Sequence, residues 1–398
     1  MPPLRTPVPD APCPRKDPPM TTTLERPAIR EPRPVRAAGL LDTSAGGHGL
    51  LRVQGGHPSP GDIQVPPALI RRYGVRKGDA VEGSCERPRV LATVDRVNGL
   101  APNSLAGRAH FRDLTPVHPT ERLRLETEKG GPAPRIVDLV SPVGKGQRGL
   151  LVAPPKTGKT VLLQQFAAAV ATNHPECHLM VVLLDERPEE VTDMRRSVRG
   201  EVYASTFDRP AKEHIALAEL AVERAKRLVE QGQHVVLLLD SLTRLCRAHN
   251  NAAGPGGRTL SGGVDAAALA GPKKLFGAAR SAEEGGSLTI LATALVETGS
   301  RADEFFFEEL KGTGNMELRL DRSLADRRVF PAVDIARSGT RREELLTGPA
   351  ELATVRALRR ALHARDGQGA LEALLDKVRR TPDNATFLRQ VQPTVPGA

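Results

Sequence analysis

Apolar runs alternate with amphipathic stretches along the chain from Ile136 onward. Helical patterns separate the runs, and the longest covers 210–231. Such alternation predicts a parallel sheet with helices on both faces. We therefore expect residues 136–398 to form an α/β domain that ends in helices. Four of its buried strands are GLLVA at 149–153, HLMVVLLD at 178–185, HVVLLLD at 234–240 and SLTILATAL at 287–295.

The chain before Ile136 divides into three segments. Residues 1–36 are rich in Pro and Arg and offer little to bury, which is typical of an extended disordered tail. Residues 37–114 carry short apolar runs between turn signals and one helical piece around ALIRRY, which predicts a small β-domain. Residues 115–135 are polar, and we expect them to be a linker.

The charge composition indicates a polyanionic partner. The 398 residues include 57 Lys and Arg against 47 Asp and Glu, and the formal charge of +10 favours nucleic acid first. The four cysteines lack the paired spacing of zinc sites or disulfide frameworks. The N-terminus shows no apolar leader, and no uncharged apolar run reaches about 18 residues. We therefore expect a cytoplasmic protein with no membrane span.

One motif predicts a nucleotide site. The stretch APPKTGKT, from Ala153 to Thr160, follows an apolar strand and opens a helix, as a phosphate-binding loop does. In such a loop Lys159 reaches the β- and γ-phosphates and the Thr160 hydroxyl binds Mg²⁺. Ala153 stands where the strict pattern has Gly, but GKT after a strand remains a specific signal. We expect ATP and Mg²⁺ as cofactors.

Two carboxylates stand at the ends of predicted strands. Asp240 ends HVVLLLD, where a magnesium-binding acid is expected, although an Asp there also caps helices. Glu186 follows HLMVVLLD, where a carboxylate orients and deprotonates the attacking water. An acid before a Pro at a helix start is equally an ordinary complement to the helix dipole. The pattern favours magnesium binding for Asp240 and leaves both roles open for Glu186.

Several late residues also suit a nucleotide site. Arg328 and Arg341 lie in arginine-rich stretches and offer positive charge to a phosphoryl-transfer transition state, Arg341 across a subunit boundary. A solvated surface position is the commoner alternative for any one of them. Phe330 is one of nine phenylalanines, and its ring suits either stacking on adenine or packing in the core.

These motifs lie in longer stretches that resemble the Rho family of transcription termination factors. The stretches include PVGKGQRGLLVAPPKTGKT, MVVLLDERPEEVTDM, VVLLLDSLTRLCRAHN and RRVFPAVDIARSGTRREELL, in the family's order. The resemblance implies a RecA-type P-loop ATPase domain after a small OB-like, cold-shock-type barrel. It also implies a homo-hexamer with nucleotide between subunits, single-stranded RNA through the centre and RNA polymerase as a partner.

The resemblance assigns roles to residues by motif. The catalytic carboxylate is Glu186, and the magnesium-side acid is Asp240. The phosphate loop is a run of six residues: Lys156, Thr157, Gly158, Lys159, Thr160 and Val161. The other implied positions are Phe330 on the base, Arg187 and Arg328 at the subunit interface, and Arg341 as the arginine finger from the next subunit.

Two loops are implied to face the central channel. Each carries one cation where the family usually has Lys: Arg258 in a glycine-rich loop and Arg301 after ETGS. A loop with a charge for the RNA backbone suits a motor that holds phosphates without reading sequence. On composition alone, a flexible connector explains the first loop equally well.

The N-terminal module departs from the family's pattern. The family presents aromatic residues there for base stacking, whereas this chain has His48, Leu50 and Gln64. Stacking contributes about 1–3 kcal/mol per base, so the RNA site of the barrel is weakened. We expect arginines, Arg52 and Arg72 among them, to compensate by charge.

Two functions from different classes follow. The first is an RNA-dependent ATP hydrolase, a translocase or helicase that binds nascent RNA and terminates transcription. The alternative is a non-terminating paralogue or regulatory subunit that binds nucleotide and holds RNA weakly, supported only by the missing aromatics. A rotary-ATPase or strand-exchange relative shares the fold but leaves the two loops unexplained. The complete hydrolytic motif series favours the first.

Overall fold

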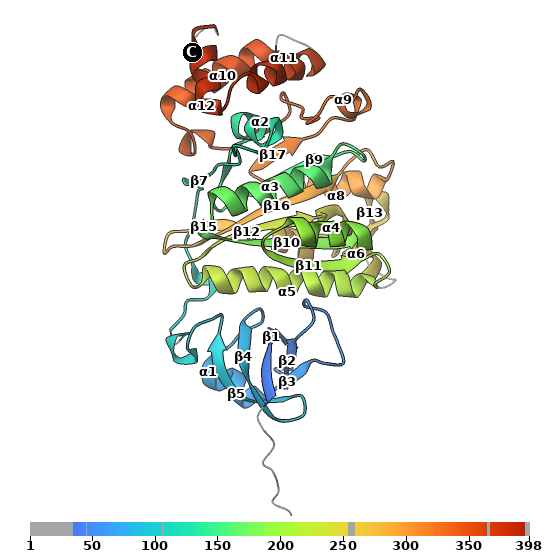
Figure 1. Ribbon diagram of the computed structural model, residues 1–398. Helices are drawn as coiled ribbons and strands as arrows, with labels where there is room; N and C mark the ends of the chain where they lie inside the picture. Colours follow the sequence, from blue (N-terminus) through green and yellow to red (C-terminus); the bar gives the residue numbers. More distant parts are fainter. Residues whose placement is uncertain (1–34, 45, 106, 254–258, 364–366, 395–398) are drawn as a thin grey trace, which may run out of the picture.

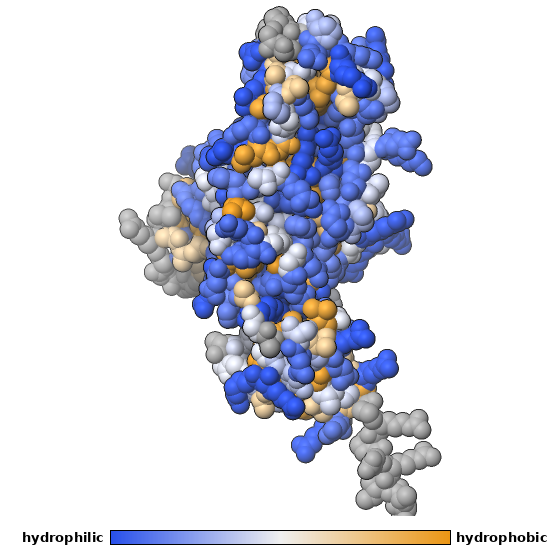
Figure 2. Space-filling view, turned by 90° about the vertical axis from the view of Figure 1, so that its left-hand side faces the viewer, coloured by the Kyte–Doolittle hydropathy of each residue, from blue (hydrophilic) through white to orange (hydrophobic). Residues whose placement is uncertain are grey.

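The computed structural model describes residues 35–394 except 45, 106, 254–258 and 364–366. Residues 1–34 of the expected tail and the loop cation Arg258 lie outside the described residues. In Figure 1 a β-barrel, a sheet between helices and a helical group follow one another from bottom to top. The face seen in Figure 2 is mainly hydrophilic, with hydrophobic residues scattered over it.

The first domain is a closed five-stranded barrel in the order β1-β2-β3-β5-β4. The alternation of apolar and polar residues puts Leu41, Leu51 and Val81 among its buried core residues. The short helix α1 (Pro67–Tyr73) ends at Gly74, whose φ of 60° favours glycine. The strands are β1 (Val35–Thr43), β2 (Gly49–Arg52), β3 (Ile63–Val65), β4 (Ala80–Arg87) and β5 (Val90–Val97).

The segment 115–135 packs on the second domain instead of lying free between the two domains. It contains β6 (Pro116–Val117) and β7 (Arg122–Leu123) and leads into α2 (Pro132–Val140). Strand β6 pairs with β15 (Arg280–Ala282) at the margin of the large sheet. Leu123 and Leu125 are fully buried, so this part of the chain contributes to the core.

The second domain contains a nine-stranded sheet whose main path is β11-β10-β12-β16-β9-β17-β18. Neighbours on this path pair in parallel as far as β17, and β18 pairs antiparallel with it. The path strands are β9 (Arg148–Ala153), β10 (Cys177–Glu186), β11 (Glu201–Thr206), β12 (His234–Asp240), β16 (Ser287–Leu295), β17 (Met316–Arg319) and β18 (Gly339–Thr340). Short pairs outside this path involve β8 (Val143–Gly144), β13 (Thr259–Leu260) and β14 (Val264–Asp265).

Helices cover both faces of this sheet, which explains why its strands are continuously apolar. In β10, Val181 and Leu183 belong to one core cluster, while Val182 and Leu184 belong to the other. The helices are α3 (Lys159–Asn173), α4 (Pro188–Ser197), α5 (Ala211–Val229), α6 (Leu242–Ala252), α7 (Ala270–Phe276), α8 (Arg301–Lys311), α9 (Arg322–Asp326), α10 (Pro349–His363), α11 (Gly367–Arg379) and α12 (Asn384–Val391).

Helix α5 lies between the barrel and the sheet, as Figure 1 shows. Charged side chains join the two domains there: Glu230, just after α5, contacts Arg76 at 3.1 Å and Arg108 at 3.3 Å. Arg108 also bonds the buried Asp79 of the barrel at 2.7 Å. Gly78 approaches the α5 backbone so closely that a Cβ would come within 2.4 Å of it. The barrel and the second domain therefore share a tight, charged interface.

Candidate nucleotide-binding site

The phosphate-binding loop joins the buried end of β9 to the start of α3. Lys156 has a φ of 68°, and Gly158, which precedes the first helical residue, has a φ of 88°. The buried Thr157 hydroxyl donates to the Pro154 carbonyl at 2.8 Å and ties the loop to itself. Thr160 follows in the first turn of α3, the position from which a hydroxyl binds Mg²⁺ in phosphate-binding loops. The loop thus has the strand–loop–helix setting that the sequence predicted.

Lys159 brings the two predicted carboxylates together. Its Nζ donates to Asp240 Oδ1 at 2.6 Å and contacts Glu186 Oε1 at 3.4 Å. The Thr293 hydroxyl donates to the same Asp240 oxygen at 2.8 Å, from the neighbouring strand β16. Both carboxylates are almost completely buried. Asp240 thus holds a carboxylate oxygen, the kind of ligand that Mg²⁺ prefers, at the end of β12.

A bulge at the end of β10 positions Glu186. The register against β11 shifts between Leu184 and Glu186, and Asp185 takes a φ of 57°. Burial and then the nearby charge of Asp240 raise the pKa of Glu186, while Lys159 opposes the rise. A carboxylate with a raised pKa is a stronger base, as removal of a proton from water requires.

Arg244 is a further site residue that the sequence did not single out. Its guanidinium contacts Glu186 at 3.3 Å and Asp185 at 3.2 Å. The residue lies in the first turn of α6, where the Ser241 hydroxyl caps its backbone N–H at 3.1 Å. In the sequence only its position marked this residue: Arg244 is three residues after Ser241, in the helix that follows β12 and its last residue Asp240.

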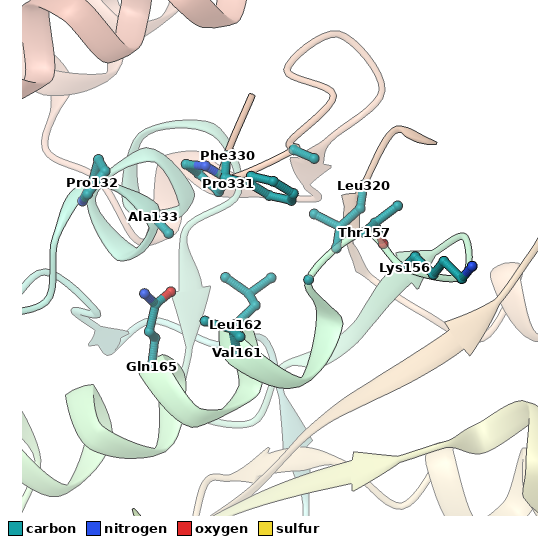
Figure 3. A pocket seen from close by; sticks show the side chains of 12 residues that line it. Pro132, Ala133, Lys156, Thr157, Val161, Leu162, Gln165, Leu320, Phe330 and Pro331 are labelled. Carbon is teal, nitrogen blue, oxygen red and sulfur yellow. The ribbon is translucent and has the colours of Figure 1, made fainter. Parts of the chain in front are cut away.

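A cavity of about 440 Å³ extends from the phosphate loop toward α2 (Figure 3). Phe330 lies over it and is 41% exposed, so its ring is available for stacking. Val161 and Leu162 of α3 form part of its wall, and Lys156, Thr157 and Gly158 stand at its phosphate end. The structure therefore brings the predicted Phe330 and the phosphate loop into one pocket.

The three arginines expected at the subunit interface differ in their positions. Arg187 and Arg328 are exposed on the surface. Arg341 follows β18, and its N–H bonds Asn315 just before β17. Strand β17 aligns its Met316 with Gly149, at the opposite end of β9 from the phosphate loop. Five strand residues span about 16 Å, so Arg341 is remote from the nucleotide site of its own chain.

The expected RNA cations differ in their surroundings. Arg52 is held by Asp42 at 2.6 Å and Asp62 at 2.7 Å, so its charge is already neutralised, contrary to our expectation of a free cation. Arg72 is exposed on α1, with its guanidinium 5.3 Å from the Tyr73 ring centre. Arg301 is exposed as the first residue of α8. Of these three, Arg72 and Arg301 remain available.

Two family models match the chain. The nucleotide-binding domain of the ATP synthase alpha/beta family matches residues 134–340, and the RNA-binding domain of Rho termination factor matches residues 37–103. A transcription termination factor Rho of Streptomyces coelicolor is 71% identical over 95% of this chain and 91% of its own length. The chain belongs to the transcription termination factor Rho family. The Rho relative of Streptosporangium roseum is 59% identical over 94% of this chain and 99% of its own length.

Solved structures support the fold of this Rho-family chain. An ATPase of the type III secretion system of pathogenic bacteria matches 71% of this chain and 87% of its own length, with a TM-score of 0.59 and 22% identity. This likeness and the closed barrel confirm a RecA-type ATPase fold behind an OB-like domain. Among the described residues, no helix is long and apolar enough to span a bilayer.

Proposed function

We propose that the chain is an RNA-dependent ATP hydrolase that moves along single-stranded RNA and terminates transcription in the cytoplasm. The observation that carries the proposal is the Lys159 ammonium between Asp240 and Glu186, directly after the Gly158 that lines a cavity of about 440 Å³, in a chain of the Rho family. The missing aromatics of the barrel were the only argument for a non-terminating paralogue, and the relatives named as termination factors do not favour it.

Each residue of the cluster has a task in hydrolysis. When ATP enters, the phosphates replace the carboxylates as partners of Lys159. Glu186 then orients a water molecule and accepts its proton, helped by the burial that raises its pKa. Arg244 keeps the Glu186 carboxylate in place from α6. Thr160 and Asp240 would hold Mg²⁺, which supplies positive charge to the phosphates.

The remaining charge comes from a second subunit in this proposal. Arg341 is remote from its own nucleotide site, and an exposed arginine at that edge suits the site of a neighbouring copy. A homo-hexameric ring lets every subunit give and receive one such arginine. Arg187 and Arg328 then line the same interface, and Arg258 and Arg301 face RNA in the central channel.

Termination requires RNA polymerase, so an in vitro transcription reaction tests the proposal. Bacterial RNA polymerase transcribes a template without an intrinsic terminator, and the protein is added with ATP. We expect shortened, released transcripts that depend on ATP hydrolysis and disappear with Lys159→Ala. Full-length transcripts only, from a protein that binds RNA and hydrolyses ATP, would contradict the terminating role.

A further inference from the structure

Gln165 closes the end of the nucleotide pocket that lies away from the phosphate loop. It is on α3 and shares a helix face with Val161 and Leu162, since residues four apart lie above one another. Figure 3 shows its amide directed into the space below Phe330. Within the described part of the chain, no hydrogen bond occupies this amide.

The other walls at this end of the pocket are apolar. They are formed by Pro132, Ala133, Leu320, Phe330, Pro331 and Ala332. The polar side chains of Lys156 and Thr157 lie at the phosphate end, and the Thr157 hydroxyl is already bonded to Pro154. Helix α2 begins with Pro132 and has Pro134 at its third position, and neither carries an N–H. Gln165 is therefore the one lining side chain at the base end that both donates and accepts.

This chemistry suits one edge of adenine. The Gln amide oxygen accepts a hydrogen bond and its NH₂ group donates one. Adenine presents a 6-amino donor beside a ring-nitrogen acceptor, which a Gln amide pairs with at two points. Stacking on Phe330 holds any base, because every base has a π-face. Recognition of the edge therefore falls to Gln165.

We propose that Gln165 reads the edge of the base by this pair of hydrogen bonds and is a specificity-determining residue of the nucleotide site. The inference rests on the proposed hydrolysis of ATP. It concerns binding of the base and leaves the chemistry at the γ-phosphate to Lys159 and Glu186. Gln165→Leu keeps the size of the side chain and removes both hydrogen bonds.

The test compares ATP with purine riboside triphosphate, which lacks the 6-amino group, in steady-state hydrolysis by the full chain with RNA. For the wild-type protein we expect kcat/KM to be about three- to tenfold lower with the analogue, the effect of one hydrogen bond. For Gln165→Leu we expect the two nucleotides to become equal, through a higher KM for ATP at unchanged kcat. Gln164→Leu, its neighbour outside the pocket lining, should keep the wild-type ratio.

A second variant is assayed for the same ratio of kcat/KM between ATP and purine riboside triphosphate. Gln165→Glu retains an acceptor for the 6-amino group, so it should still prefer ATP to the analogue where Gln165→Leu does not. A wild-type ratio in Gln165→Leu, or equal use of both nucleotides by the wild-type protein, would overturn the inference and leave ATP hydrolysis intact. Failure of the wild-type protein to hydrolyse either nucleotide would instead overturn the proposed function together with the inference.

Discussion

At the scale of single residues, the site depends on two buried carboxylates that share one lysine. Lys159, Glu186 and Asp240 were predictable because a motif and the ends of apolar strands fix their places in a parallel α/β domain. Arg244 was not predictable, since its contacts with Glu186 and Asp185 require the bulge in β10. The neutralised Arg52 was also unpredictable, because its partners come from β1 and from the loop before β3.

Glu186→Gln should separate nucleotide binding from hydrolysis. The amide keeps the size of the side chain but cannot accept the proton of the attacking water. We expect kcat to fall by about 10²- to 10⁴-fold. The dissociation constant of ATP, measured by equilibrium dialysis, should stay within a few-fold of the wild-type value. Glu189→Gln, exposed on α4, is the matched control and should change neither quantity. Normal turnover by Glu186→Gln would remove its assigned role.

At the scale of elements, the sequence predicted the strands of the large sheet better than the segments that pack beside them. Continuous apolar runs identified β9, β10, β12 and β16, because a strand that is buried on both faces of a sheet is apolar at nearly every position. The linker expected at 115–135 contains β6, which pairs with β15 far along the chain. That pairing depends on tertiary packing, and polar composition alone did not reveal it.

Glu201 joins three elements and should make stability depend on pH. It begins β11, and its carboxylate contacts His178 of β10 at 2.8 Å and Arg224 of α5 at 3.4 Å. Burial opposes its charge, but His178 and Arg224 hold its pKa down at about 2, against an ordinary value of 4.5. Because the folded-state pKa is lowered, this stabilisation is present above pH 4.5 and is lost as the pH falls through about 2.

Urea unfolding at several pH values measures this effect. We expect Glu201→Gln to be less stable than the wild-type protein near neutral pH, and the difference between them to shrink as the pH falls from 4.5 toward 2. A difference that stays constant over this range would show that the ionised carboxylate is not the source of the stabilisation.

At the scale of the whole molecule, ion pairs join the barrel to the ATPase domain. The Glu230 side chain is completely buried and also contacts Arg227 at 2.9 Å, while one of its oxygens accepts the Phe111 N–H at 2.8 Å. Two domains were predictable from the change of pattern along the chain. Their interface was not, because Arg76 and Arg108 lie far from Glu230 in the sequence and carry no motif.

Removing the charge of Glu230 should loosen this interface. Glu230→Gln leaves Arg76, Arg108 and Arg227 without their shared buried partner. We expect a loss of about 3 kcal/mol in the free energy of unfolding, measured with urea. Glu219→Gln is the control on α5, where the carboxylate is 53% exposed and pairs loosely with Lys77. A loss no greater than that of Glu219→Gln would contradict a structural role for the network.

Steady-state ATP hydrolysis with and without nucleic acid shows whether RNA drives this ATPase. The purified chain is assayed alone, with pyrimidine-rich single-stranded RNA and with single-stranded DNA, at about 50 and 200 mM salt. We predict strong stimulation by RNA that weakens at the higher salt, because the barrel offers cations in place of stacking aromatics. Hydrolysis that is indifferent to RNA at both salt concentrations would contradict an RNA-driven motor.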